Sequence, residues 1–283
     1  MSVSAIQRLL HREDFRRRPL RALSRRVIWR LRWLSTSRPW HLHLDNGLSM
    51  FAPHCGAGAL IYYQGCSEPE TTRFLQRFLK PGMIFFDIGA HIGEYALVAS
   101  LRVGSAGAVH AFEAQPDTVE ILRRNVASNG LKNVIITHCA VAASDGTADF
   151  AVRREPSLSS MACEGGQDGN GVLQVITVPK RHLDAYCWST GAWPHLIKID
   201  VEGAELEVLR GAKSLLEKPK TEAPVWIFEY SPETYRRFQR SLADVIELFD
   251  RHGYRVYRLK QDGGMGSIQN GHWDRSQNLI ARK

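Results

Sequence analysis

The chain has 283 residues, 44% hydrophobic and 23% charged, which is typical of a globular protein with one large domain or two small ones. No apolar run reaches the roughly 18 residues that a membrane-spanning helix needs. Arginines occupy the place of a signal peptide's apolar core, so we expect neither an integral membrane protein nor a secreted one. Five cysteines without metal-type spacing predict no metal site and favour a reducing compartment, hence the cytoplasm.

The net charge of +8 belongs to the N-terminal segment. Residues 1–40 contain eleven arginines and two acidic residues, which gives +9, so the other 243 residues sum to −1. Residues 19–34 combine a helical stripe of Leu20, Leu23, Val27 and Leu31 with an opposite face of Arg and Trp, which predicts an amphipathic helix. Three interpretations stay open: a helix packed on the catalytic body through its Leu stripe, a peripheral contact with the inner face of a membrane, or a contact with an acidic partner.

The predicted elements divide the chain into a basic helical segment (1–40), a cap (41–80) and a main domain (81–283). The cap is predicted to hold a hairpin at 41–52 around Asn46-Gly47, a short strand at 59–63 and a helix at 68–79. In the main domain, apolar runs alternate with helical patterns, as in a parallel sheet covered on both faces. The expected strands are 83–88, 108–112, 134–140, 195–200, 225–230, 254–259 and 278–281.

A second hairpin, from 147–154 and 172–178, interrupts this alternation. Its tip, Glu155 to Gly171, is rich in Ser and Gly. A connection of that length is usually functional, and we expect a lid that selects the substrate.

The strongest motif is a buried strand that runs through Asp87 into a glycine turn, Gly89-Ala90-His91-Ile92-Gly93, and then into a helix. Gly89 permits close approach of a ligand, and Gly93 permits close packing of the helix start against the strand. A carboxylate at the strand exit suits an ammonium or sulfonium better than a pyrophosphate. Glu113, at the end of the next strand, can accept the two hydroxyls of an adenosine ribose. Together the motifs favour S-adenosylmethionine over NAD as the cofactor.

A third motif, Lys-Ile-Asp-Val-Glu-Gly-Ala-Glu at 198–205, places Asp200 and Glu202 at another strand exit. Ligands of open α/β sheets bind beyond the carboxyl ends of the strands, so both side chains should face the cleft, as should Glu229. The alternative is structural: Lys198 pairs with a neighbouring acid, and Glu202 lies in the first turn of a helix.

These motifs resemble those of the FkbM-type family of S-adenosylmethionine-dependent methyltransferases, over residues 68–283. The resemblance implies a Rossmann-like class I methyltransferase sheet, mostly parallel with an antiparallel last strand, behind the N-terminal extension. His91 stands where the family often has Asn. With Cys139 and Ala140 beside the adenine, the expected cofactor-binding residues are Asp87, Gly89, Ala90, His91, Gly93, Glu113, Cys139, Ala140 and Asp200.

The resulting hypothesis is an O-methyltransferase that acts on a hydroxyl of a sugar, glycan or small metabolite. Asp200 or Glu229 is the expected base, and Glu202 orients a neighbour or binds substrate. His91, His110 and His138 are weaker candidates for the base, and we expect a structural role for each. The alternatives are an N-methyltransferase acting on a peptide, a metal-dependent O-methyltransferase that uses the three acids near the cleft, and a cofactor-binding scaffold without turnover. No adjacent pair of metal ligands supports the metal-dependent alternative. No nucleic-acid substrate is expected. Methyltransferases that act on the amino groups of adenine or cytosine carry an Asn/Asp-Pro-Pro-Tyr/Phe sequence after the fourth strand, where this chain has Asp200-Val-Glu. The oligomeric state is not predicted.

Overall fold

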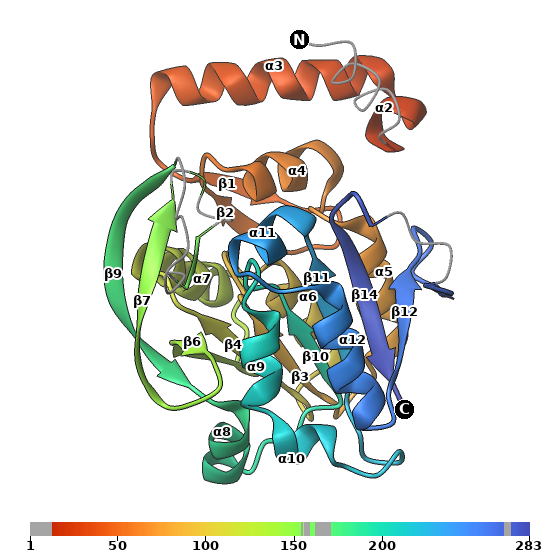
Figure 1. The fold of residues 1–283 in the computed structure, drawn as a ribbon. Helices are drawn as coiled ribbons and strands as arrows, with labels where there is room; N and C mark the ends of the chain where they lie inside the picture. The colour runs from red at the N-terminus through yellow and green to blue at the C-terminus, as the bar shows by residue number, and fades with distance from the viewer. Residues whose placement is uncertain (1–12, 154, 156–158, 162–170, 269–272) are drawn as a thin grey trace. The chain divides into compact units, whose positions relative to one another are not determined.

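A computed structural model describes residues 13–153, 155, 159–161, 171–268 and 273–283 (Figure 1). The chain forms two compact units, Met1–Glu68 and Pro69–Lys283. The boundary between them falls inside the segment 41–80 that the sequence suggests as a cap. Among the described helices, none is long and apolar enough to cross a bilayer.

The first unit contains helices and one hairpin. Its elements are α2 (Glu13–Arg17), α3 (Pro19–Ser35), β1 (Trp40–His43), β2 (Ser49–Ala52) and α4 (Gly56–Gln64). The helix from Pro19 and the antiparallel hairpin are confirmed. The strand predicted at 59–63 is wrong, because that apolar run lies within α4. At the start of α4 the Cys55 side chain accepts a hydrogen bond from the Gly58 amide, and at its end Gly65 adopts the left-handed conformation.

The packing of α3 reverses the predicted orientation. Trp29 is 3% exposed and packs against Trp40 and Tyr62 of the same unit. By contrast Leu20 is 83% exposed, and Leu23, Val27 and Leu31 are also exposed. The prediction that the Arg/Trp face stays free is therefore wrong, whereas packing of the Leu stripe on the main domain stays a prediction. Aromatic rings bury more area than leucines and offer stacking partners, so they form the packed face.

The second unit is built on an eight-stranded sheet covered by helices. Strand order is β13-β12-β14-β11-β10-β3-β4-β5. The elements in this unit are α5 (Pro69–Phe78), β3 (Ile84–Ile88), α6 (Glu94–Val103), β4 (Ala108–Glu113), α7 (Pro116–Ser128), β5 (Val134–His138), β6 (Ala140–Val141), β7 (Gly146–Arg153), β8 (Ser160–Met161), β9 (Val172–Arg181), α8 (Leu183–Thr190), β10 (Leu196–Ile199), α9 (Glu205–Arg210), α10 (Lys213–Leu216), β11 (Val225–Tyr230), α11 (Pro232–Arg237), α12 (Leu242–Arg251), β12 (Arg255–Leu259), β13 (Met265–Gly266) and β14 (Gln277–Arg282).

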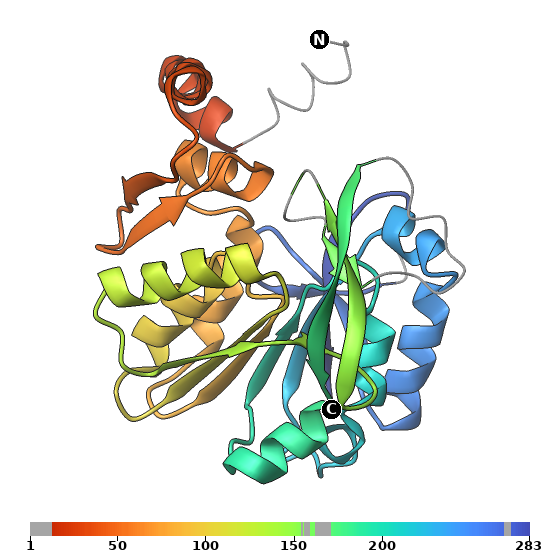
Figure 2. The ribbon, with the colours of Figure 1, turned by 90° about the vertical axis from the view of Figure 1, so that its left-hand side faces the viewer.

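The direction of each strand confirms the expected class I methyltransferase fold. Strands β5, β4, β3, β10 and β11 are parallel to one another, whereas β14 is antiparallel to β11 and β12. Helices α6 and α7 cover one face, and α9 and α12 cover the other (Figure 2). Every residue of β10 is buried, as expected for a central strand. The carboxyl ends of β3, β4, β10 and β11 therefore share one edge.

The second hairpin is also present. β7 and β9 pair antiparallel in a four-stranded sheet with β6 and β8. Most of the predicted lid, Glu155 to Gly171, lies outside the described residues. Its role stays a prediction.

Candidate active site

The loops that follow β3 and β10 touch each other at Gly89. Gly89 has φ +78°, and a Cβ there would lie 1.9 Å from the Asp200 carbonyl oxygen. The Asp200 amide donates to the Ile88 carbonyl at 2.9 Å, and the amides of Gly89 and Ala90 both donate to the Phe112 carbonyl. Gly89 is thus required for contact with the protein's own backbone, a reason that the sequence motif did not suggest.

Gly93 ends this turn in the left-handed region, with φ +90°. A Cβ there would lie 2.4 Å from Cδ1 of Leu122, on α7. The expected close packing at the helix start is therefore present, but its partner is α7 rather than the strand.

Glu113 joins the end of β4 to the glycine turn. Its Oε2 accepts from the His91 amide at 2.8 Å and its Oε1 from the Gln115 amide at 2.9 Å. The carboxyl is 8% exposed, and burial raises its pKa to about 7 despite these bonds. These bonds hold Glu113 in place, and the Ala114 amide adds to them. A carboxylate has about four acceptor positions, so Glu113 retains capacity for a ligand hydroxyl.

Asp87, at the end of β3, is a fully buried carboxyl next to a buried cation. Burial raises its pKa to about 6, Lys198 opposes this change, and Asp200 adds to it. The backbone amide of Ala96 lies near enough to oppose the increase, but among the described residues no group makes a well-formed hydrogen bond to either Asp87 carboxylate oxygen. The Lys198 ammonium instead lies 2.8 Å from Oδ2 of Asp200 and 4.5 Å from the centre of the Tyr95 ring. A buried carboxyl without a partner is a place where a ligand's donor can bind.

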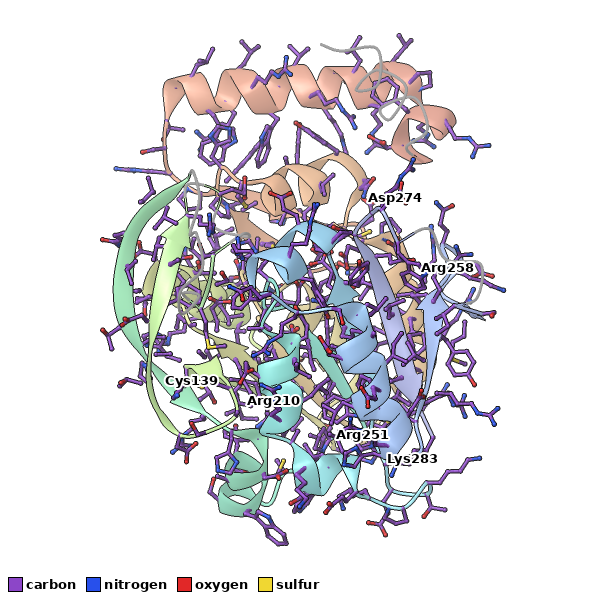
Figure 3. All side chains as sticks on the ribbon, in the orientation of Figure 1. Cys139, Arg210, Arg251, Arg258, Asp274 and Lys283 are labelled. Carbon is purple, nitrogen blue, oxygen red and sulfur yellow. The ribbon has the colours of Figure 1, made fainter. Side chains whose placement is uncertain are left out.

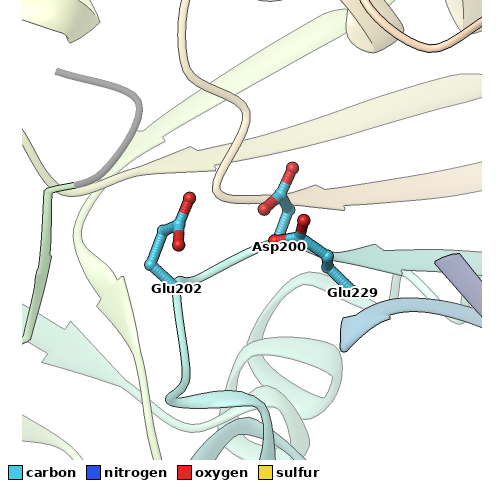
Figure 4. A group of neighbouring side chains, drawn as sticks. All are labelled: Asp200, Glu202 and Glu229. Atoms are coloured by element: carbon cyan, nitrogen blue, oxygen red, sulfur yellow. The ribbon is translucent and has the colours of Figure 1, made fainter. Parts of the chain in front are cut away.

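The three predicted catalytic carboxyls converge. Each of Asp200, Glu202 and Glu229 has a carboxylate oxygen within 4.8 Å of the others (Figure 4). The structural alternative holds in part, because Lys198 does pair with Asp200. Glu202, however, precedes α9 and has φ +54°. Burial raises the Glu202 pKa to about 8, and the neighbouring Asp200 adds to the increase.

The loop that carries Glu202 is held from two sides. Oε1 of the buried Glu205 accepts from the Gly203 amide at 3.2 Å and the Val201 amide at 3.4 Å. On the other side, Arg237 donates to the Glu202 carbonyl at 2.9 Å. Sequence patterns alone assign no role to Glu205 or Arg237. A left-handed non-glycine residue is costly and persists where surrounding contacts determine it, often at functional sites.

Other candidates have structural contacts. Cys139 is 3% exposed within the core, where burial raises its pKa to about 12, and Ala140 begins β6 (Figure 3). Their place beside adenine stays a prediction. His110 shares a hydrogen bond with the Tyr186 hydroxyl, and His138 with the Ala114 carbonyl. Desolvation lowers the pKa of both His91 and His110 to about 4, so they are neutral at neutral pH.

The carboxylate cluster also has the donor set of a hard divalent cation. The sequence predicts no metal. The absence of a metal stays a prediction, and the Lys198 ammonium already supplies one positive charge to Asp200.

Comparison with known proteins identifies the family. The methyltransferase FkbM domain matches residues 87–256, more than half of the chain. This chain belongs to the FkbM methyltransferase family. The match begins at Asp87 and includes Glu113, Asp200, Glu202 and Glu229. The expected cofactor, S-adenosylmethionine, is confirmed by the family, and the buried carboxyls at 87 and 113 are groups that its ammonium and ribose hydroxyls can pair with.

Two curated relatives cover different shares of this FkbM-family chain. The hexuronic acid methyltransferase AglP of Haloferax volcanii is 28% identical over 161 residues, 53% of this chain and 58% of its own. The 31-O-demethyl-FK506 methyltransferase FkbM of Streptomyces tacrolimicus is 26% identical over 245 residues, 76% of this chain and 88% of its own. The chain thus spans little more than half of the first relative.

A solved methyltransferase FkbM from Methylobacillus flagellatus is 15% identical, with a TM-score of 0.45. The match covers 81% of this chain and 56% of that one.

Proposed function

We propose that the protein transfers the methyl group of S-adenosylmethionine to a hydroxyl oxygen of a sugar, glycan or small metabolite. The observation that carries this proposal is the convergence of Asp200, Glu202 and Glu229 at the sheet edge where Asp87 and Glu113 also lie. A hydroxyl must lose its proton as the new bond forms, and a carboxylate within reach can accept it.

The bound cofactor supplies an activated methyl on sulfur. The acceptor oxygen forms the new C–O bond as the C–S bond breaks, and its proton passes to the base. We assign that base to Asp200 or Glu229. The ion pair with Lys198 uses only Oδ2 of Asp200, which leaves Oδ1 for the acceptor. Glu202, whose pKa is raised to about 8, holds a proton at neutral pH and can donate a hydrogen bond that orients the acceptor.

Holding the acceptor in line is the other task of the site. Positioning alone accounts for a large part of the barrier reduction in such reactions, because it removes the entropic cost of bringing two molecules together. The turn at Gly89, the two amides on Glu113 and the Glu205 contacts fix the loops from which the site side chains project. Preorganised loops of this kind are what in-line transfer requires.

The relatives support an oxygen acceptor. One is described as acting on a hexuronic acid and another on the 31-O position of demethyl-FK506. The first name specifies a sugar acid as substrate, and the second specifies an oxygen as the acceptor atom. For the present chain we propose the broader class, hydroxyls of sugars and related metabolites.

The full chain incubated with methyl-labelled S-adenosylmethionine tests the proposal. The acceptor panel contains neutral sugars, uronic acids, their nucleotide-linked forms, a polyketide alcohol and peptides. We expect label on a hydroxyl oxygen of a sugar or metabolite, located by fragmentation mass spectrometry. Label on a peptide nitrogen would establish the N-methyltransferase alternative instead. Tight cofactor binding without transfer to any acceptor, in the panel or in cell extract, would favour a scaffold.

A further inference from the structure

The outer face of α3 is an apolar strip that no other described residue of its own unit covers. Six side chains form it, at helical positions that span an arc of about 140°. Their exposed fractions range from 46% to 83%. Within this arc only Ser24 and Ser35 are polar, and no charged residue falls in it. The outer face of α3 consists of Leu20, Leu23, Val27, Ile28, Leu31 and Leu34.

The inner face of α3 fixes this orientation. Trp29 packs against aromatic rings of the same unit, as described above. Arg25 donates to the carbonyls of Tyr62 and Tyr63, at 2.9 and 3.1 Å. Arg26 pairs with Asp14 at 2.8 Å and lies over the Tyr63 ring. These contacts hold the inner face, so the outward leucines follow from packing inside the first unit.

The charges around the outer face are all positive. Arg21 and Arg30 are exposed and lie just beyond the two edges of the apolar arc, and Arg18 is exposed directly before the helix. Between Phe15 and Leu44 the sequence contains no acidic residue. The helix therefore presents an apolar centre with a cationic border on each side.

We propose that the outer face of α3 docks on an anionic lipid surface. Leucines and valines of an interfacial helix enter the boundary between headgroups and acyl chains, while flanking arginines reach the phosphates. Basic residues near such a surface each add attraction, and the absence of acidic residues removes the opposing repulsion. A second copy of this chain is disfavoured as the occupant, since it would bring two rows of arginines together. The inference does not depend on the proposed methyl acceptor.

The test is co-sedimentation of the full chain with vesicles of phosphatidylcholine alone and of equimolar phosphatidylcholine and phosphatidylglycerol. We expect strong binding to the anionic vesicles, weak binding to the neutral ones, and loss in high salt. The double variant Leu20→Ser/Leu31→Ser should partition about tenfold or more weakly. Its matched control is Leu101→Ser/Leu173→Ser, two exposed leucines of the second unit, which should bind as the unchanged chain does.

A double arginine substitution separates the electrostatic contribution to vesicle binding from the apolar one. Arg21→Ser/Arg30→Ser should lower binding to anionic vesicles by about tenfold or more and leave weak binding to neutral vesicles unchanged. Arg102→Ser/Arg123→Ser, exposed in the second unit, is the control. Circular dichroism and cofactor affinity check that every variant is folded.

Three results would overturn the proposal. The first is absence of binding to anionic vesicles by the full chain. The second is equal binding by the Leu20/Leu31 variant and its control. The third is a dimer, detected by light scattering without lipid, that the same variant dissociates, because the outer face would then be covered by a second copy.

Discussion

The carbonyl oxygen of Asp200 lies 1.9 Å from the point that a Cβ on Gly89 would occupy. The turn after β3 and the exit of β10 are therefore in direct backbone contact. Because Gly89 follows Asp87 by two residues, this contact also fixes the spacing between the expected cofactor carboxyl and the expected catalytic one. A side chain at position 89 would push the two apart.

Gly89→Ala should lower stability by about 2–4 kcal/mol and weaken cofactor binding, because it adds a backbone clash to the cost of a positive φ. The matched control is Gly253→Ala. Gly253 has φ +77°, nearly that of Gly89, but a Cβ there meets nothing within 4 Å. It should cost only about 1 kcal/mol in urea unfolding and leave the calorimetric cofactor affinity intact. Equal effects of the two variants would show that the contact with Asp200 is unimportant.

Glu113→Ala should weaken binding of S-adenosylmethionine by about 1–3 kcal/mol, because hydroxyls in a buried site lose a charged acceptor. Titration calorimetry with the cofactor and its demethylated product measures this, and NAD should not bind. Glu120→Ala, an exposed carboxyl on α7 paired with Arg123, serves as the control. Unchanged affinity in Glu113→Ala would refute the ribose assignment.

Asp200→Asn or Glu229→Gln should keep cofactor affinity and lose about 10²–10⁴ in turnover, whichever of them is the base. His91→Ala is the informative comparison, since its imidazole is neutral and its amide, not its ring, holds Glu113. We expect a smaller loss from it. If His91→Ala is the more damaging change while the cofactor still binds, the base must be reassigned.

Glu202→Gln should make the protein more stable than the unchanged chain at pH 8. In the unfolded chain a glutamate has a pKa of about 4.3, against about 8 in the folded site, so the folded state holds an extra proton between these values. Stability is then lost as pH rises from about 4 to about 8. A glutamine does not titrate, so the free energy of unfolding of the variant should exceed that of the unchanged chain by about 1–3 kcal/mol at pH 8.

Chemical unfolding of Glu202→Gln at several pH values measures this difference. Little gap should remain near pH 4, where Glu202 is protonated in both states. Glu247→Gln, an exposed carboxyl on α12, should follow the unchanged chain throughout. A constant gap at every pH would exclude titration as the cause.

The sheet could be predicted from sequence because buried parallel strands are continuous apolar runs. Ile84–Ile88 and Leu196–Ile199 are such runs, each interrupted by a single charged residue. The prediction of a strand at 59–63 is wrong for the same reason. A short apolar run occurs in both strands and helices, and only the residues that cap its ends distinguish the two. The caps of α4 are a cysteine and a glycine, and cysteine is a weak N-cap signal.

The convergence of Asp200, Glu202 and Glu229 could be predicted because each follows or ends a strand of one sheet. The roles of Lys198 and Glu205 could not. A lysine inside Leu-Ile-Lys-Ile appears only as a break in an apolar run, and its ion pair with Asp200 depends on the exit geometry of β10. Glu205 holds two backbone amides of its own loop, a contact that depends on the left-handed φ of Glu202 and Gly203.

Strand β14 lies between β11 and β12, with Asn278 opposite Glu229 in the register. During synthesis, β11 therefore leaves the ribosome almost fifty residues before the strand that covers its free edge. Until residue 282 has been made, that edge offers unpaired amides and carbonyls to other chains. Strand pairs that close long loops also form slowly. We expect the carboxylate cluster to be the last part of the sheet edge to become rigid, and chains interrupted before residue 277 to need chaperones to stay unaggregated.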